Sequence, residues 1–484
     1  MKPNPYPQRC DGVIPGVYTR RQMLKTFTTG FGYIAFAGLT TQAALAASKA
    51  KGNNIPPEGS SEQSLLLPKK PHFTPRAKRV IFLGMEGAPS QLDTFDYKPK
   101  LKEYNGKPET DNEDRTLIGS PFEFKQFGQS GKYVSELFPS VAAKVDELCF
   151  LQGLWTNAPA LHPQAWPAMH TGSPVFVRPS MGSWVLYGLG TDNQNLPGFI
   201  TIKPALSIGG GQSYEAGFLP SVFSATRIGE SKTPIQNCSV NNIRNTIVAT
   251  KAQRKQLDFV QQLNHDLLQK GSLDHQVEGV IESYELAFKM QGEVPEVTDI
   301  SKESQATLDL YGVGTDETDD FGRQCLLARR FAEAGVRFIE VCYDDWDHHG
   351  QLYAGLKKSC KAVDQPIAAL LTDLKQRGLL EDTLVLWGGE FGRTAGSPKP
   401  DGRDHSTKGW TMWMAGGGVK KGFTYGATDE FGINAVSGRM DYHDLHATLL
   451  HILGLDHEKL TFRYGGRDFR LTDVSGVVAE SILA

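Results

Sequence analysis

Residues 80–96, VIFLGMEGAPSQLDTFD, begin with a continuous apolar run and continue into a polar segment that contains glycine and proline. A short apolar run of this kind predicts a β-strand that is buried on both faces. Similar runs recur along the chain, and stretches with helical spacing lie between them. The runs are Leu148–Leu151, Phe199–Ile202, Phe338–Val341, Thr383–Trp387 and Thr411–Met414. This alternation predicts an α/β fold with a mostly parallel central sheet covered by helices on both faces.

Two of the helical stretches are Asp320–Ala334 and Leu352–Arg377, and each is followed by a glycine that can end a helix. Residues 205–300 break the alternation, because a loop-rich part with a triple glycine is followed by a charged helical pair at about 250–292. The triple glycine does not open a βαβ unit, so it does not predict a nucleotide site. We expect one domain, residues 76–484, with a cap inserted at about 205–300.

The first 46 residues have the features of an export signal. Arg20-Arg21 precedes a moderately hydrophobic segment, Thr26–Leu45, which closes in an A-x-A pattern at Ala46. These features predict a twin-arginine signal peptide at residues 1–46, and the threonines and glycines within it are unfavourable for a permanent membrane helix. We therefore expect a periplasmic or extracellular protein that is not attached to the membrane after cleavage. Residues 47–75, rich in Lys, Pro, Gly and Ser, predict a linker or surface strap.

The composition of the chain excludes some classes of function. The formal net charge is −3, so there is no basic excess to neutralise the phosphates of a nucleic acid. Five cysteines remain after the predicted signal, and their spacing fits neither a zinc ribbon nor a disulfide scaffold.

Polar clusters lie next to several predicted strands, where an α/β sheet binds its ligands. Asp347 and His349 follow one strand, and in extended chain residues two apart point to the same side. Glu390 follows another strand, and His405 shortly precedes the last one. Carboxylates and imidazoles that converge from different loops are typical of a divalent-metal site. Each residue by itself could instead cap a helix or bind a backbone amide.

The order of these motifs resembles the alkaline phosphatase-like superfamily, which includes sulfatases and phosphodiesterases. More closely, the chain resembles a family of exported, sulfatase-like bacterial proteins of unknown function (DUF1501). The resemblance covers residues 79 to about 473. It rests on Pro89–Asp96, Trp346–Gly350, Gly389–Thr394, Gly402–His405 and Gly466–Thr472.

The resemblance implies a divalent metal ion (Zn²⁺, Ca²⁺, Mg²⁺ or Mn²⁺) bound by Asp347, His349, Glu390 and His405. It also implies a carboxylate ligand after the first strand, and both Glu86 and Asp93 are candidates for it. Members of the family often occur beside large cytochrome-like exported proteins, so an exported cytochrome-like partner is a further expectation.

The chain departs from the sulfatases at the nucleophile. Sulfatases carry a modified Cys or Ser in C/S-x-P-S-R, whereas the comparable stretch here, His162–Gly172, places His162 at that position. Formylglycine chemistry is therefore excluded on this interpretation. His162 could act as a general acid or base, a metal ligand, a phosphohistidine-type nucleophile or a helix cap. A water molecule activated by the divalent ion is the simplest attacking group.

Two arginines are candidates for substrate binding. Arg393 and Arg178 could clamp an anionic ester with the fork of a guanidinium group, although both could instead form salt bridges. His443 and His446, near the C-terminus, could approach the metal or only pack. We expect a metal-dependent hydrolase that acts on a sulfate or phosphate ester of a small molecule or glycan. The alternative is a non-catalytic subunit that keeps the fold and binds a glycan or a protein.

Overall fold

The computed structural model describes most of the chain after the predicted signal. The described residues are 64–109, 112–240, 243, 248–270 and 275–484. The predicted signal peptide and residues 47–63 of the predicted linker lie outside them. The chain divides into two compact units, of which the second, residues 61–243 and 254–484, contains the whole central sheet.

The central sheet has eight strands in the order β15-β6-β14-β10-β1-β9-β7-β8. All neighbouring strands pair in parallel except β14, which is antiparallel to both β10 and β6. The prediction of an α/β fold with a mostly parallel sheet is therefore confirmed. The strands are β1 Arg79–Met85, β6 Leu148–Leu154, β7 Phe199–Ile202, β8 Thr226–Ile228, β9 Phe338–Tyr343, β10 Thr383–Gly388, β14 Trp410–Gly416 and β15 Phe423–Tyr425.

The reversed direction of β14 decides where the functional loops meet. Trp387, near the end of β10, pairs with Trp413, and Leu384, near its start, pairs with Gly416. The residues just before β14 therefore lie at the edge where β10 and β1 end. This is why a polar cluster that precedes one strand can join clusters that follow the others.

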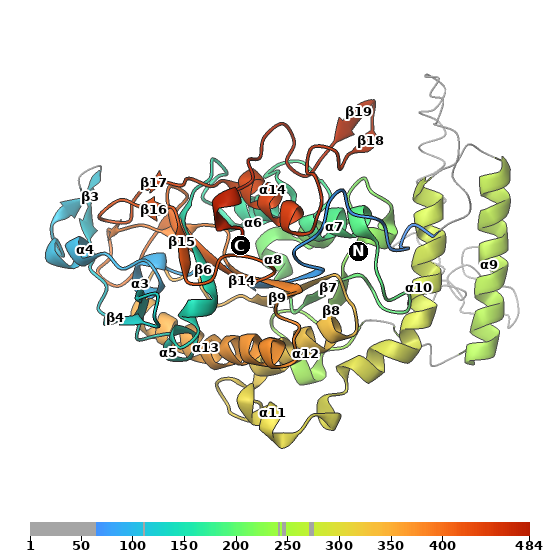
Figure 1. Cartoon of the computed structure of the whole chain (residues 1–484), viewed down its shortest axis with the longest axis horizontal. Helices are drawn as coiled ribbons and strands as arrows, with labels where there is room; N and C mark the ends of the chain where they lie inside the picture. The colour runs from blue at the N-terminus through green and yellow to red at the C-terminus, as the bar shows by residue number, and fades with distance from the viewer. Residues whose placement is uncertain (1–63, 110–111, 241–242, 244–247, 271–274) are drawn as a thin grey trace, which may run out of the picture. The chain divides into compact units, whose positions relative to one another are not determined.

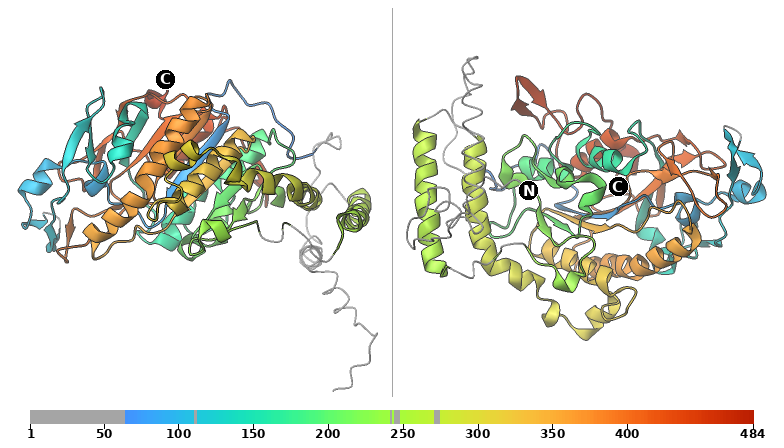
Figure 2. Two further views of the ribbon diagram at one scale, coloured as in Figure 1. Left: turned by 90° about the horizontal axis from the view of Figure 1, so that it is seen from below. Right: turned by 180° about the vertical axis from the view of Figure 1, so that it is seen from behind.

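Helices cover both faces of the sheet (Figure 1). The views in Figure 2 show the long helices α12 and α13 along one face. On this face lie α5 Pro139–Ala142, α12 Asp319–Glu333 and α13 Leu352–Gln376, and on the other lie α6 His162–Thr171, α7 Met181–Leu189 and α14 Tyr442–Ile452.

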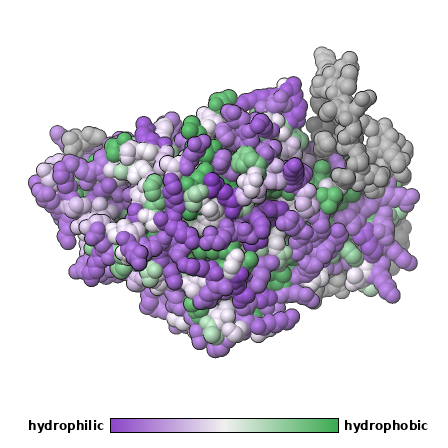
Figure 3. Space-filling model, in the orientation of Figure 1, coloured by the Kyte–Doolittle hydropathy of each residue, from purple (hydrophilic) through white to green (hydrophobic). Residues whose placement is uncertain are grey.

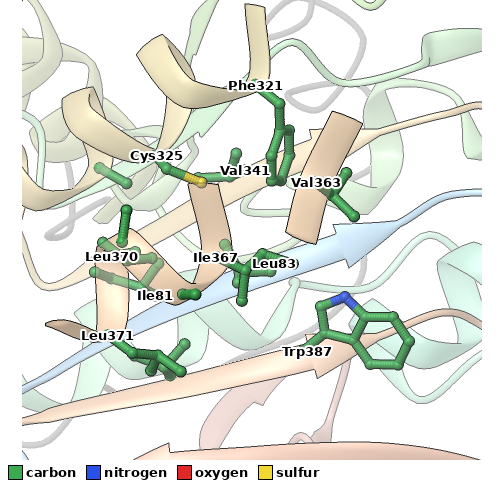
Figure 4. Close-up of a cluster of buried hydrophobic side chains, with 14 of the residues drawn as sticks. Ile81, Leu83, Phe321, Cys325, Val341, Val363, Ile367, Leu370, Leu371 and Trp387 are labelled. Atoms are coloured by element: carbon green, nitrogen blue, oxygen red, sulfur yellow. The ribbon is translucent and has the colours of Figure 1, made fainter. Parts of the chain in front are cut away.

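The core has two halves because successive side chains of a strand point to opposite faces. Ile81 and Leu83 of β1 belong to the cluster under α12 and α13, whereas Phe82 belongs to the cluster under α6, α7 and α14. Figure 4 shows the first cluster, with Phe321, Cys325, Val341, Val363, Ile367, Leu370, Leu371 and Trp387 around the β1 residues. Burial of each such aliphatic or phenyl side chain stabilises the fold by roughly 1.5–3 kcal/mol.

The segment predicted as an inserted cap is partly integral to the sheet. It supplies β8, which pairs in parallel with β7 at the edge. It also contains α8 Leu206–Gly209, α9 Thr250–Lys270 and α10 His275–Thr298, and α10 packs against the 3₁₀ turn Ser221–Phe223 and against α12.

Smaller elements surround the central sheet. One three-stranded sheet, in the order β12-β3-β2, lies beside the functional loops, and β11 pairs with β13. The short helices are α3 Gln91–Thr94, α4 Pro99–Glu103 and α11 Gln305–Leu310, and the strands are β2 Pro108–Glu109, β3 Asn112–Leu117, β4 Phe124–Phe127, β5 Lys132–Ser135, β11 Gly392–Arg393, β12 Gly396–Ser397, β13 His405–Ser406, β16 Ala427–Thr428, β17 Ala435–Ser437, β18 Phe462–Tyr464 and β19 Arg467–Phe469.

The described part of the predicted linker lies against the domain. The amide of Lys69 donates to the carbonyl oxygen of Leu189 at 2.8 Å, and the amide of Arg76 donates to that of Ile452 at 2.8 Å. These contacts connect residues 64–76 to the ends of α7 and α14. None of the helices that the structure describes is long and apolar enough to cross a membrane. The face drawn in Figure 3 is mainly hydrophilic, with scattered hydrophobic residues.

His446 connects α14 to α6 inside the protein. Its ring is fully buried, and Nε2 lies 2.6 Å from the carbonyl oxygen of Met169. Burial lowers the pKa of His446 to about 3, so the ring is neutral in the folded protein and donates its Nε2 proton to that carbonyl. Of the two alternatives for this histidine, the contacts therefore fit packing.

We expect the stability advantage of the wild type over a His446→Gln variant to shrink as the pH falls below about 6.5. The unfolded chain binds the proton near its ordinary pKa of 6.5, whereas the folded protein resists it. The difference in unfolding free energy should fall by about 1.4 kcal/mol per pH unit. Urea denaturation of both proteins at pH 7, 6 and 5 measures it, and parallel pH profiles would contradict the prediction.

Candidate metal centre

Four segments bring side chains together at the carboxyl edge of the sheet. His162 is the first residue of α6, which follows β6, and Asp347 and His349 follow β9. Glu390 follows β10, and His405 lies on β13, just before the antiparallel β14. The structure therefore places the predicted ligands Asp347, His349, Glu390 and His405 in one cluster, together with the predicted catalytic residue His162.

The centre of the cluster is Oδ1 of Asp347. It lies 3.2 Å from Nε2 of His162, 3.1 Å from Nε2 of His405 and 3.2 Å from Nε2 of His349. The Nε2 atoms of His349 and His405 are 2.9 Å apart. Ligand atoms around a tetrahedral ion, with bonds of about 2.0–2.1 Å, lie about 3.3 Å from one another. The spacing in the cluster is therefore close to that of atoms that share an ion.

Hydrogen bonds on the far side of two rings direct their Nε2 atoms into the cluster. Nδ1 of His162 bonds with Oε1 of Glu390, and Nδ1 of His405 lies 2.7 Å from the carbonyl oxygen of Ala160. Each acceptor holds the Nδ1 proton, so Nε2 presents a lone pair, as in histidines that ligate metals. Nε2 of His162 is buried, and its contact is with Oδ1 of Asp347, 3.2 Å away. His162, Asp347 and His405 could therefore hold a metal ion.

Glu390 lies behind His162. Its side chain is fully buried, and Oε1 also accepts the amide proton of Gly87 at 3.2 Å. Phe391, the next residue, is buried as well, and its ring lies 4.9 Å from the His162 ring and 4.6 Å from the His405 ring between centroids. These neighbours restrict the rotation of both imidazoles. Glu390 thus contacts a candidate ligand, and Phe391 packs against two.

The electrostatics of the cluster favour a cation. Burial raises the pKa of Asp347, but hydrogen bonds from His162, His405 and Arg393 outweigh it and hold the pKa well below its usual range. Burial lowers the pKa of His162, but Asp347 and Glu390 outweigh it and raise the pKa to about 9. The carboxylates that favour a proton on His162 also favour a divalent ion at the same place, and the two compete.

Arg393, predicted to bind substrate, is 1% exposed and bonds inside the protein. Its Nη2 donates to Oδ1 of Asp347 at 2.8 Å. Its other acceptors are the backbone oxygens of Gly87, Ala88, Trp346 and Arg403. Burial lowers the pKa of Arg393, and Asp347 opposes that effect. The guanidinium therefore connects the loops that carry the ligands, and its predicted role in substrate binding stays a prediction.

The second predicted clamp, Arg178, is not brought to the cluster by its contacts. Nη1 lies 3.5 Å from Oδ2 of Asp473, and the guanidinium lies over the ring of Phe469, 5.3 Å from its centroid. Both partners belong to the C-terminal region. The role predicted for Arg178 therefore has no contact with the candidate ligands to support it.

Neither carboxylate after the first strand belongs to the group of described residues that could hold an ion. Glu86 is buried and accepts hydrogen bonds from the amide of Ala205 at 2.9 Å and the hydroxyl of Tyr214 at 3.0 Å. Burial raises the pKa of Glu86 well above its ordinary value. Asp93 pairs with Nε of Arg403 at 2.7 Å. The choice that the sequence left open between Glu86 and Asp93 therefore stays open.

Two residues that sequence analysis did not single out extend the cluster. Oδ1 of Asp404 lies 3.3 Å from Nδ1 of His349, and Oδ2 of Asp404 lies 3.2 Å from Nη2 of Arg115. The position of Asp404 beside His405 was a signal that could have indicated it. Arg115 had no such signal, because it lies in a polar segment 289 residues before Asp404 in the sequence.

The fold and the cluster define an α/β protein with a candidate metal centre at the carboxyl edge of its sheet. Residues 77–483 match the family described as protein of unknown function (DUF1501), and the chain belongs to this family, as predicted. No curated protein matches the chain by sequence.

The chain is also similar to solved structures of sulfatases and phosphatases. A sulfatase from Pseudoalteromonas sp. is 14% identical, with 84% of this chain and 72% of that chain covered and a TM-score of 0.38. A phosphonate monoester hydrolase from Silicibacter pomeroyi is 11% identical (78% and 73% covered, TM-score 0.34). A protein in the alkaline phosphatase superfamily from Vibrio parahaemolyticus is 11% identical (81% and 70% covered, TM-score 0.34). No residue of this chain takes a role from these structures.

We expect an Arg393→Met variant to lose about 3–5 kcal/mol of unfolding free energy, because the change removes the donor of several backbone carbonyl oxygens inside the protein and a charged partner of Asp347. Guanidinium denaturation measures the loss. The matched control is Arg463→Met, whose arginine is 66% exposed and pairs with Asp468, and it should change stability by less than about 1 kcal/mol. Equal stability of the two variants would contradict the connecting role of Arg393.

Proposed function

We propose that this chain is an exported, metal-dependent hydrolase that cleaves a sulfate or phosphate ester without a formylglycine nucleophile. The observation that carries the proposal is the convergence of ligand atoms from His162, Asp347 and His405, with Nε2 of both histidines within 3.2 Å of Oδ1 of Asp347. The resemblance of the motifs to the alkaline phosphatase-like superfamily supports the reaction class. The arginine pair at residues 20–21 supports export by the twin-arginine pathway to the periplasm or beyond.

In this proposal, His162, Asp347 and His405 hold the ion, and His349 supplies a fourth nitrogen. A divalent ion at this place supplies Lewis-acid activation of a water molecule and of an ester oxygen. Glu390 keeps the proton on Nδ1 of His162, so that Nε2 remains a ligand atom. His162 thus takes the ligand role among the alternatives that the sequence left open.

The exposure of the ligands indicates the side from which an ester enters. The side chains of Asp347 and His349 are 44% and 40% exposed, whereas those of His162 and His405 are 13% and 14% exposed. The inner histidines are thus shielded from water, and the outer pair borders solvent. We propose that a small-molecule or glycan ester enters on the outer side, next to Asp347 and His349.

A non-catalytic subunit that binds a glycan or a protein, such as an exported cytochrome-like partner, is the second candidate. It is favoured by the absence of a serine or cysteine nucleophile at the position where His162 stands, bonded to Glu390. The two candidates differ in their need for bound metal and in turnover, so the following experiments separate them.

We expect the exported form to bind one divalent ion, and expect His162→Ala and His405→Ala to lose it, because each removes a ligand nitrogen. Glu390→Gln should weaken metal binding by about 10–100-fold, since it releases the orientation of His162. Elemental analysis and metal titration measure both effects. His451→Gln is the control, because that histidine packs against Phe73 away from the cluster and should leave the metal content unchanged. Wild-type protein that takes up no ion would overturn the proposal.

We expect hydrolysis of an aryl sulfate or aryl phosphate to stop when the ion is removed by a chelator and to return when the ion is added back. Asp347→Asn should lose activity, because it removes the carboxylate at the centre of the cluster. Steady-state assays with both esters measure it. Metal-loaded protein that turns over neither ester would favour the binding subunit, and hydrolysis unaffected by the chelator would contradict metal dependence.

A further inference from the structure

The arginines buried around the candidate metal centre use their N–H groups for hydrogen bonds and ion pairs within the protein. Arg393 donates to backbone oxygens and to Asp347. Arg403, next to the site, is fully buried and pairs with Asp93. A positive side chain that binds the anionic end of an ester must therefore come from another part of the structure.

Arg115 reaches the cluster from β3. Its Nη2 lies 3.2 Å from Oδ2 of Asp404, and Oδ1 of the same carboxylate lies 3.3 Å from Nδ1 of His349. A guanidinium group has five N–H donors. Within the described ranges of the chain, the contact with Asp404 is the one hydrogen bond that the side chain of Arg115 makes. Its side chain is 30% exposed, so N–H groups remain for a ligand.

The backbone around Arg115 is fixed to the same loops that carry the ligands. β3 pairs with β12, and Thr116 lies opposite Ser397. The buried Arg403 donates to the carbonyl oxygen of Ile118 at 2.8 Å. Arg115 is thus held on a paired strand between these two attachments, which is the kind of support that a preorganised binding residue needs.

The outer side of the cluster continues without a break to Arg115. Contacts run from Asp347 to His349, from His349 to Asp404 and from Asp404 to Arg115. These four side chains are between 30% and 44% exposed, in contrast to the two inner histidines. A ligand that contacts the ion from the solvent side therefore has Arg115 along the same row.

The charges around the site also support an anion-binding role for Arg115. The carboxylates of Asp347, Glu390 and Asp404 carry three formal negative charges. Arg393 and a divalent ion would balance them. Arg115 adds a positive charge beside the ligands, and a positive charge there attracts a sulfate or phosphate group.

We infer that Arg115 binds the sulfuryl or phosphoryl oxygens of the substrate, beside the ion held by His162, Asp347 and His405. The inference rests on the proposed function and adds to it the recognition of the anionic group. Arg115 keeps one N–H on Asp404 and presents others as a fork, which suits a tetrahedral oxyanion. It takes the part that the sequence suggested for Arg393 and Arg178.

The test measures anion binding by the full exported chain loaded with Zn²⁺ or Mn²⁺. Calorimetric titration with inorganic sulfate and with inorganic phosphate gives the affinities. Arg115→Gln should weaken anion binding by about tenfold or more, with the metal content unchanged. The anion affinity of Arg115→Lys should lie between those of the wild type and Arg115→Gln, because lysine keeps the charge without the fork of N–H donors. Arg463→Gln, which removes an exposed arginine elsewhere, should bind the anions like the wild type.

Comparison with Asp404→Asn separates substrate binding from a structural role. Asp404→Asn should lower the metal affinity, since it releases His349. An Arg115→Gln variant that loses metal to the same extent acts through Asp404, and this result would overturn the inference. Equal anion affinity in Arg115→Gln and the wild type would also overturn it, while retained metal leaves the proposed function intact. Wild-type protein that binds no metal would overturn both the proposed function and the inference about Arg115.

Discussion

The candidate site depends on one buried guanidinium. Arg393 is buried from solvent, and its N–H groups donate to oxygens of the loop after β1, the loop after β9 and the loop before β13. A charge buried in this way is costly unless every donor is bonded and a carboxylate is nearby. Asp347 provides that carboxylate. The interaction therefore couples the stability of the loops to the position of the central candidate ligand.

A second buried arginine extends the same arrangement. Arg403 pairs with Asp93 and donates to backbone oxygens of the β12 region and of Ile118. It thereby fixes the segment that contains Asp404 and His405, and with it the small sheet that carries Arg115. Asp93, a candidate ligand from sequence, pairs with Arg403 in this structure. The inner part of the site is thus a scaffold of buried ion pairs, and the outer part consists of half-exposed side chains.

The three imidazole nitrogens of the cluster lie close to one another and to one carboxylate oxygen. The rings of His349 and His405 present Nε2 atoms 2.9 Å apart, and the buried Nε2 of His162 lies 3.2 Å from the same Asp347 oxygen that both of them contact. Nitrogen lone pairs at this separation repel one another unless a proton or a metal lies between them. A proton satisfies two atoms at most, whereas one divalent ion satisfies four. The geometry therefore allows these side chains to hold an ion.

The sequence by itself predicted the sheet, because runs such as Val80–Met85 favour buried strands, and it predicted that Asp347, His349 and Glu390, which follow strands, share one edge. Local patterns carry that information. His405 reaches the same edge because β14, which it precedes, runs in the reverse direction. Only the tertiary structure decided what each side chain contacts. Arg393 became internal, Glu390 came to lie behind His162, and Arg115 joined the site from 289 residues away. Such contacts depend on strand order and on the reversed β14, which no spacing in the sequence encodes.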